Sequence, residues 1–230
     1  MSCRMRPLLF SVLLLLTVAT FNTQAAVSDV SRIYHEIPSL EKFDVCYGGG
    51  CAEIQQLELD VDEWQRIVSI FNAEENTSIN ALLENAVLER EQISNAIGVF
   101  EGIVGLKTGT STDLAGTFDN ASMSGQLDCN DEAINGTTYM HLMRRYGLIK
   151  LHEIEDLRTR NFFFTGWPHT TAVIHEIATG DRYAVDSWLF DNGTPATIVP
   201  FALWKSGYIP LDSPLNHATQ GTAQVSHSAE

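Results

Sequence analysis

The sequence predicts an α+β fold, in which a mainly helical amino-terminal half packs on a small antiparallel sheet from the carboxy-terminal half. Residues 60–104 carry apolar side chains at helical spacing, whereas residues 149–190 contain short runs typical of strands. A small, polar, glycine-rich stretch at 107–126 separates them. Helices first and antiparallel strands afterwards predict an α+β fold.

Two helices are expected in the first half. Asp60 or Asp62 can cap the first. Its apolar face consists of Trp64, Ile67, Val68 and Phe71. The second pattern begins near Ser78 and continues to Val104. Both apolar faces are interpreted as core, without a chemical role.

The stretch 107–126 is predicted to be a loop, because its periodicity stops and its residues are small and polar. A loop of this length is a functional lid or binding loop, or else a plain connector, and the sequence leaves both open. A third helix is expected to begin at residues 128–132. One face of it would carry Cys129, Ala133, Gly136, Met140 and Met143.

The remaining elements are short. Strands are expected at 149–152, 161–164, 169–177, 182–190 and 196–199, with a hairpin turn at 179–181 and a helical turn at 201–204. Residues 212–230 are polar and predicted to be a disordered tail. One domain is expected over 26–211, made of a mainly helical part at 26–106, the loop at 107–126 and a catalytic core at 127–211.

The first 25 residues resemble a secretory signal peptide. Arg4 and Arg6 precede an apolar run, and Thr23-Gln24-Ala25 offers small residues for cleavage. The run is too short to span a membrane, so we expect a periplasmic or secreted protein with no membrane insertion in its mature form.

The chain is acidic, with a formal net charge of -15 that becomes -17 after loss of the first 25 residues. This charge disfavours nucleic acid and anionic membranes, because both are bound through basic patches. It is compatible with cationic partners, with calcium, or simply with solubility. A protein or peptide is the expected substrate partner, and the oligomeric state is left open.

The cysteines indicate one disulfide and one free thiol. Cys3 belongs to the signal peptide, and Cys46 and Cys51 flank the flexible sequence Tyr47-Gly-Gly-Gly. Cysteines of exported proteins usually pair, so a Cys46–Cys51 disulfide is expected. Cys129 then remains unpaired, either buried and inert or kept for its reactivity.

Cys129 is the candidate nucleophile. A helix start stabilises a thiolate, so we expect a lowered thiol pKa there. A cysteine nucleophile also needs a base and a group that orients the base. His169 and His175 are candidate bases, and Asp186 is the candidate orienting acid.

The order Cys129, His169, Asp186, with Trp-Pro-His-Thr-Thr-Ala-Val leading into Tyr-Ala-Val-Asp-Ser-Trp, resembles the bacterial transglutaminase-like cysteine proteinases of the papain-like group. The resemblance covers residues 126–190 and implies a papain-like, transglutaminase-like fold. It also implies a Cys–His–Asp triad that hydrolyses peptide or isopeptide bonds.

Further roles belong to the mechanism expected for this triad. The Cys129 backbone N–H and the Gln126 side chain are candidate oxyanion donors, and Trp188 either shields the His–Asp pair from water or is a core residue. Some exported members hold calcium through acids that flank the cysteine. Asp128 and Asp131 are the candidates here, whereas Asn130 is neutral where an acid would be expected. No other cofactor is expected.

His169 is the predicted base, and His175 is the alternative. A tight turn at Gly180-Asp181 would place Asp186 opposite His175, while the family pattern favours His169. A bulge or a longer turn would bring His169 closer. The predicted function is an exported cysteine peptidase or amidase. The alternative is a non-catalytic calcium- or peptide-binding module on the same fold.

Overall fold

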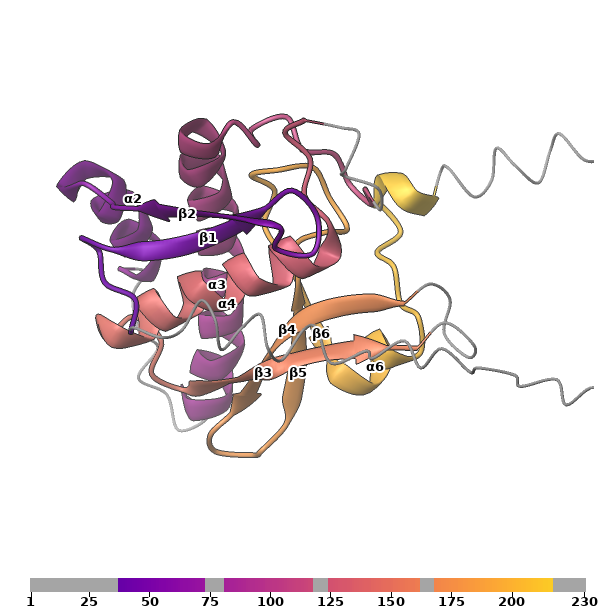
Figure 1. Ribbon diagram of the computed structural model, residues 1–230. Coiled ribbons are helices and arrows are strands. Elements are labelled where there is room, and N and C mark those ends of the chain that lie inside the picture. The colour runs from indigo at the N-terminus through magenta and orange to yellow at the C-terminus, as the bar shows by residue number, and fades with distance from the viewer. Residues whose placement is uncertain (1–36, 73–80, 118–123, 162–167, 217–230) are drawn as a thin grey trace, which may run out of the picture.

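The computed structural model describes residues 37–72, 81–117, 124–161 and 168–216. The predicted signal peptide and most of the predicted tail lie outside these ranges. The described residues form the predicted α+β fold, with a two-stranded hairpin, a four-stranded antiparallel sheet and four helices (Figure 1). Within these ranges no helix is both long enough and apolar enough to cross a bilayer.

An amino-terminal β-hairpin, which the sequence did not predict, precedes the helices of the segment 26–106. Strands β1 (Phe43–Tyr47) and β2 (Glu53–Leu57) pair in antiparallel register. The turn between them uses Gly48, Gly49 and Gly50, all with positive φ, which only glycine adopts at no steric cost. The predicted disulfide is confirmed, and it closes this hairpin between Cys46 and Cys51.

The two predicted helices of the first half are confirmed. Helix α2 (Val61–Phe71) begins at Asp60, whose carboxylate accepts from the Glu63 backbone N–H while the Glu63 carboxylate accepts from the Asp60 backbone N–H. Helix α3 (Ala81–Thr108) extends into the start of the predicted loop, so residues 107–108 are helical. Its buried face includes Ile93, Ile97, Phe100 and Val104.

Helix α4 (Cys129–Arg145) occupies the centre of the molecule, packed between the hairpin, α3 and the four-stranded sheet (Figure 1). Thirteen of its seventeen residues are buried, which makes it the main core helix rather than a surface one. Tyr139 stacks on Phe100 of α3 with ring centroids 4.7 Å apart. Cys129, its first residue, is therefore carried on a rigid support.

The sheet has the order β3-β4-β5-β6. Its strands are β3 (His152–Arg160), β4 (His169–Glu176), β5 (Arg182–Asp186) and β6 (Thr197–Pro200). The helical turn expected at 201–204 is α6 (Phe201–Lys205). The sequence placed strands at 149–152 and 161–164, but β3 lies between them. Residues 162–164 are outside the described ranges.

Two boundaries differ from the prediction. Strand β5 ends at Asp186, and residues 187–190 form a turn instead of continuing the strand to 190. The predicted disorder after Leu211 is wrong for its first residues. Ser213 is fully buried and its hydroxyl donates to the Leu189 carbonyl at 2.7 Å. The chain is therefore fixed beside the 187–190 turn as far as the described residues reach.

Candidate active site

Cys129 is a free, buried cysteine at the first position of α4. Asp128 caps the helix, and its carboxylate accepts from the backbone N–H groups of Asn130 and Asp131, both at 2.9 Å. As the first helical residue, Cys129 has a backbone N–H without a partner inside the helix. The thiol and this N–H group lie together at the positive end of the helix dipole.

The disulfide hairpin is bound directly to the first two turns of α4. The Asp131 carboxylate accepts from the backbone N–H of Cys51 at 2.6 Å and of Gly49 at 2.8 Å. The Asn135 side chain accepts from the Cys46 N–H and donates to the Cys46 carbonyl. These contacts fix the orientation of the helix start.

The candidate calcium ligands are occupied by backbone groups. Asp128 accepts from Gly50 as well as from its own helix, and Asp131 is fully buried on the hairpin. Burial, with the nearby Asp128 charge, raises the pKa of Asp131 to about 6. Within the described part of the chain, no three His, Cys, Asp or Glu side chains are grouped so that they could hold a metal. Calcium binding stays a prediction.

His169 and Asp186 form a close, buried pair. The Nε2 atom of His169 lies 2.6 Å from Oδ2 of Asp186, and both residues are at most 2% exposed. Its other ring nitrogen, Nδ1, is buried and has no hydrogen-bond partner among the described residues. One nitrogen is therefore bound to the acid, and the other is available for a proton.

The register of the hairpin explains why His169 meets the acid. His175 pairs with Arg182, and Ala172 with Val185, so continuing the ladder places Asp186 opposite Thr171. The turn is longer than the tight turn considered above, closed by a hydrogen bond from the Glu176 N–H to the Asp181 carbonyl at 2.8 Å. The extra turn residues shift Asp186 along the strand towards His169.

His175 lies at the other end of these strands. Its Nδ1 atom is 3.3 Å from the Glu155 carboxylate, and Arg182 binds the same carboxylate. The His175 side chain is about one-third exposed, at 32%. It belongs to a surface charge group, and the structure brings only His169 of these two to Asp186.

Cys129 contacts the strand that carries the histidine. The backbone N–H of Thr170, the residue after His169, donates to the Cys129 sulfur. Trp188 and Leu189 pack on Cys129 in a small apolar cluster. Strand β4, the turn after β5 and the start of α4 thus meet, and the three predicted catalytic side chains lie in one buried place.

The thiol pKa contradicts the lowering expected from the helix start. Burial raises the pKa of Cys129 to about 12, and the charges of Asp128 and Asp186 act in the same direction. The Thr170 N–H opposes this rise without overcoming it. The resting thiol is therefore protonated, and its reactivity depends on a base that takes the proton.

Trp188 lies directly beside His169. Its ring centroid is 4.5 Å from that of His169, and its indole N–H donates to the Thr117 carbonyl at 3.0 Å. The Trp188 carbonyl accepts from Gly116. The described part of the predicted loop is thus bound to the residue that covers the histidine.

Gln126 is held inside that loop. Its amide nitrogen donates to the Thr112 carbonyl at 2.9 Å, and its amide oxygen accepts from Leu114 N–H and the Thr117 hydroxyl. With these bonds the side chain organises the loop, and its role as an oxyanion donor stays a prediction.

Two residues that the sequence reasoning missed complete the surroundings of Asp186. The Trp204 indole N–H donates to Oδ2 of Asp186 at 2.7 Å. Arg160, opposite His169 in the β3–β4 ladder, donates to the Trp204 carbonyl at 2.7 Å. The only sequence signal was the short helical turn at 201–204, which gave no reason to connect Trp204 with the acid.

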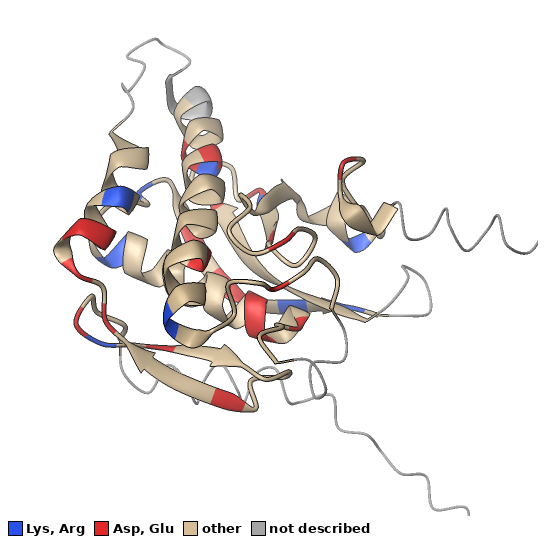
Figure 2. Cartoon of the chain, turned by 90° about the horizontal axis from the view of Figure 1, so that it is seen from above, with Lys and Arg blue, Asp and Glu red and all other residues tan. Residues whose placement is uncertain are grey.

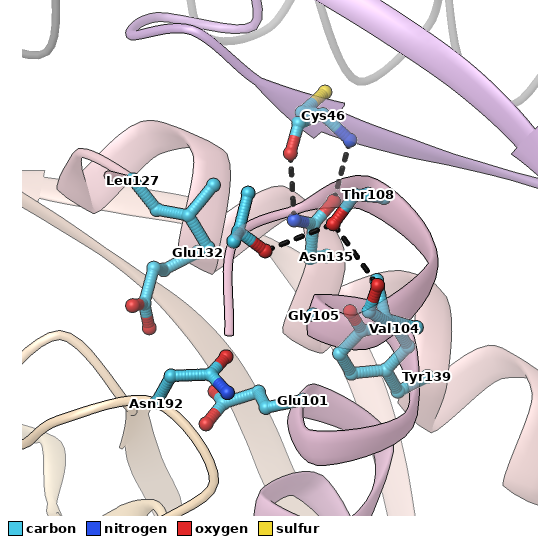
Figure 3. A pocket seen from close by; sticks show the side chains of 11 residues that line it. Cys46, Glu101, Val104, Gly105, Thr108, Leu127, Glu132, Asn135, Tyr139 and Asn192 are labelled. Atoms are coloured by element: carbon cyan, nitrogen blue, oxygen red, sulfur yellow. Dashed lines mark hydrogen bonds between the residues drawn. The ribbon is translucent and has the colours of Figure 1, made fainter. Parts of the chain in front are cut away.

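Buried carboxylic acids also lie beside the first turn of α4. Glu101 of α3 and Glu132 of α4 line one small pocket together with Asn192 (Figure 3). Ser187, the neighbour of Asp186, donates to Glu132. Burial raises the pKa of Glu101 to about 7 and that of Glu132 well above its usual value.

A third acid joins this cluster from the loop. Asp113 interacts with Glu132, and one of its oxygens accepts from the Leu127 N–H at 2.7 Å. Burial raises the pKa of Asp113 to about 6. Elsewhere acidic residues are spread over helices, strands and connections, with basic residues among them (Figure 2).

No protein-family model matches the chain, and no curated protein or solved structure matches it either. The interpretation of the site therefore depends on its own geometry and chemistry.

Proposed function

We propose that the protein is a thiol-dependent acyl-transfer enzyme, a cysteine peptidase or amidase with the triad Cys129, His169 and Asp186. One observation carries the proposal. His169 has Nε2 on a buried carboxylate and Nδ1 without a hydrogen-bond partner in the described part of the chain, and the next residue contacts the cysteine sulfur. A nucleophile, a base and an orienting acid in this relation are the requirements of nucleophilic acyl transfer.

The proposed reaction begins with proton transfer from the Cys129 thiol to Nδ1 of His169. Asp186 holds the imidazole through Nε2 and stabilises the imidazolium. The thiolate attacks an amide carbonyl, and the C–N bond breaks as His169 returns the proton to the leaving amine. Water then attacks the thioester, giving a carboxylic acid and regenerating the thiol.

The developing oxyanion needs hydrogen-bond donors. The Cys129 backbone N–H is proposed as one donor, because it lies at the helix start with no intrahelical partner. Whether water or an amine accepts the acyl group depends on what reaches the thioester. The proposal therefore covers hydrolysis of peptide or isopeptide bonds, with transfer to an amine as the same chemistry.

The proposal extends to fold family and location. A helix that presents a cysteine to a His- and Asp-bearing antiparallel sheet supports the papain-like, transglutaminase-like assignment. The Cys46–Cys51 disulfide supports export to the periplasm or the medium, because such bonds persist in oxidising compartments.

Alkylation of the native protein with iodoacetamide, followed by mass spectrometry, tests the proposal without knowledge of the substrate. A thiol with a pKa of about 12, acting alone, would be ionised in only about one molecule in 10⁵ at pH 7. We expect Cys129 to react at pH 7 faster than a small free thiol. Labelling that requires unfolding would refute the enzyme and favour a non-catalytic module.

His169→Ala and His175→Ala form a matched pair on one strand. The first should abolish rapid labelling, together with hydrolysis of fluorescently labelled casein, and the second should leave the labelling nearly unchanged. The opposite result would assign the base to His175. Full casein hydrolysis by Cys129→Ala would exclude the proposed mechanism.

A further inference from the structure

We propose that Trp204, held in place by Arg160, is a positioning residue for the carboxylate of Asp186; this inference rests on the proposed function. Trp204 lies on α6, which follows β6 directly at the edge of the sheet (Figure 1). Its ring also contacts His169, with centroids 5.8 Å apart, but its one N–H donates to Asp186, so the positioning role proposed here is that of the N–H acting through the acid.

The hydrogen-bond geometry at Asp186 carries the proposal. His169 Nε2 and Trp204 Nε1 both bind Oδ2, at 2.6 and 2.7 Å. Two donors on one oxygen fix the rotation of the carboxylate, so the imidazole ring is held in one orientation. Without the indole donor, the Asp186 carboxylate would lose one of these two hydrogen bonds. Its orientation would then depend on the bond to His169, the residue that it is proposed to orient.

Trp204 is itself held rigidly. It is 1% exposed, and its ring stacks on Phe201 with centroids 5.6 Å apart. The guanidinium of Arg160 lies 5.1 Å over the indole ring and also donates to the Trp204 carbonyl. Arg160 thus holds both the ring and the backbone of Trp204, so the buried indole has little freedom to move away from Asp186.

Arg160 adds a charge as well as a contact. It is only 6% exposed, and its Nε atom has no hydrogen-bond partner among the described residues. Its positive charge interacts with Asp186 and with Cys129. A buried cation that interacts with the Cys129 sulfur favours the thiolate that forms when His169 takes the proton.

The test measures the pH dependence of Cys129 alkylation in Trp204→Phe, which keeps an aromatic ring and removes the N–H donor. The matched control is Trp64→Phe, a tryptophan of α2 that packs on Phe100 and Tyr146. If the indole positions the acid, the thiolate forms less readily in Trp204→Phe. Labelling at pH 7 should then slow about tenfold and its pH midpoint rise by about one unit.

A second measurement uses the unmodified protein, in case Trp204→Phe does not fold. The Trp204 indole N–H signal in an NMR titration should shift with the same midpoint as Cys129 labelling, because its acceptor oxygen senses the proton on His169. The Trp64 signal should not follow that midpoint.

The outcomes separate the two proposals. If wild-type Cys129 is inert until the protein unfolds, the enzyme proposal fails and this inference fails with it. If the wild type labels rapidly but folded Trp204→Phe has the wild-type pH profile, only the positioning role is overturned. The positioning role is also overturned if the Trp204 indole signal does not shift at the pH midpoint of Cys129 labelling.

Discussion

Because the carboxyl group of Glu101 is buried, we expect the folded state to become less stable as the pH rises. Glu101 is 8% exposed, and burial raises its pKa from 4.5 to about 7. Its carboxyl accepts a hydrogen bond from the Gly193 N–H at 3.1 Å, and the nearby charge of Asp113 adds to the rise. The perturbation that removes this group is Glu101→Gln, an uncharged side chain of nearly the same shape, which also removes a charge that raises the pKa of Glu132.

The sign and size follow from linkage. Below about pH 4.5 the proton is bound in both the folded and the unfolded chain. Between about pH 4.5 and 7 the folded chain keeps it and the unfolded chain loses it, so the free energy of unfolding falls through this window. The rise in pKa to about 7 corresponds to a loss of about 3 kcal/mol by pH 8.

Urea unfolding at pH 4, 6 and 8 measures this effect. Glu91→Gln is the matched control, since Glu91 lies on the same helix with an exposed side chain. Relative to this control, Glu101→Gln should be about 3 kcal/mol more stable at pH 8 and close to equal at pH 4. His141, whose pKa burial lowers, opposes the trend equally in both variants. If the free energy of unfolding changed with pH in the same way in both variants, the reasoning would be refuted.

Two further predictions concern packing and the disulfide. A Cβ on Gly98 would lie 2.9 Å from the Gly193 carbonyl oxygen, so Gly98→Ala should destabilise the fold by about 1–3 kcal/mol in urea unfolding. Gly102→Ala, on the same helix with nothing within 4 Å, should instead stabilise it by about 0.5–1 kcal/mol, and equal effects would contradict the packing argument. Replacing Cys46 and Cys51 by serine should cost about 2–5 kcal/mol and slow Cys129 labelling; an unchanged labelling rate would show that the hairpin does not support the helix start.

Elements with long apolar stripes were predictable, and short ones were not. The face of α3 repeats over several turns, so its position followed from Ile93, Ile97 and Phe100. Strand β1 has only five residues. An alternation of buried and exposed side chains over so short a stretch is too weak to indicate a strand from sequence. Strand β3 contains a register shift between Glu155 and Arg158, which interrupts the alternation that would have located it.

The site was predictable as an ordered set of residues, and its geometry was not. Cys129, His169 and Asp186 stand in the expected order, but the choice between histidines depended on the length of a turn. The thiol pKa could not be predicted because burial by Trp188 and its neighbours is a tertiary property. The Trp204 bond to Asp186 joins residues on separate elements, and sequence patterns carry no information on such contacts.

The docking of the disulfide hairpin on α4 links the order of oxidation to the assembly of the site. Cys46 and Cys51 are five residues apart, so their loop closes at a small entropic cost compared with any loop that includes Cys129. This pair is therefore favoured to oxidise first, which protects Cys129 from mispairing. The same loop supplies the two backbone N–H groups that donate to Asp131. A chain with reduced cysteines therefore lacks a covalently closed support for the helix start that carries Cys129. Oxidation would then act as a maturation step that both completes the helix start and spares the thiol on it.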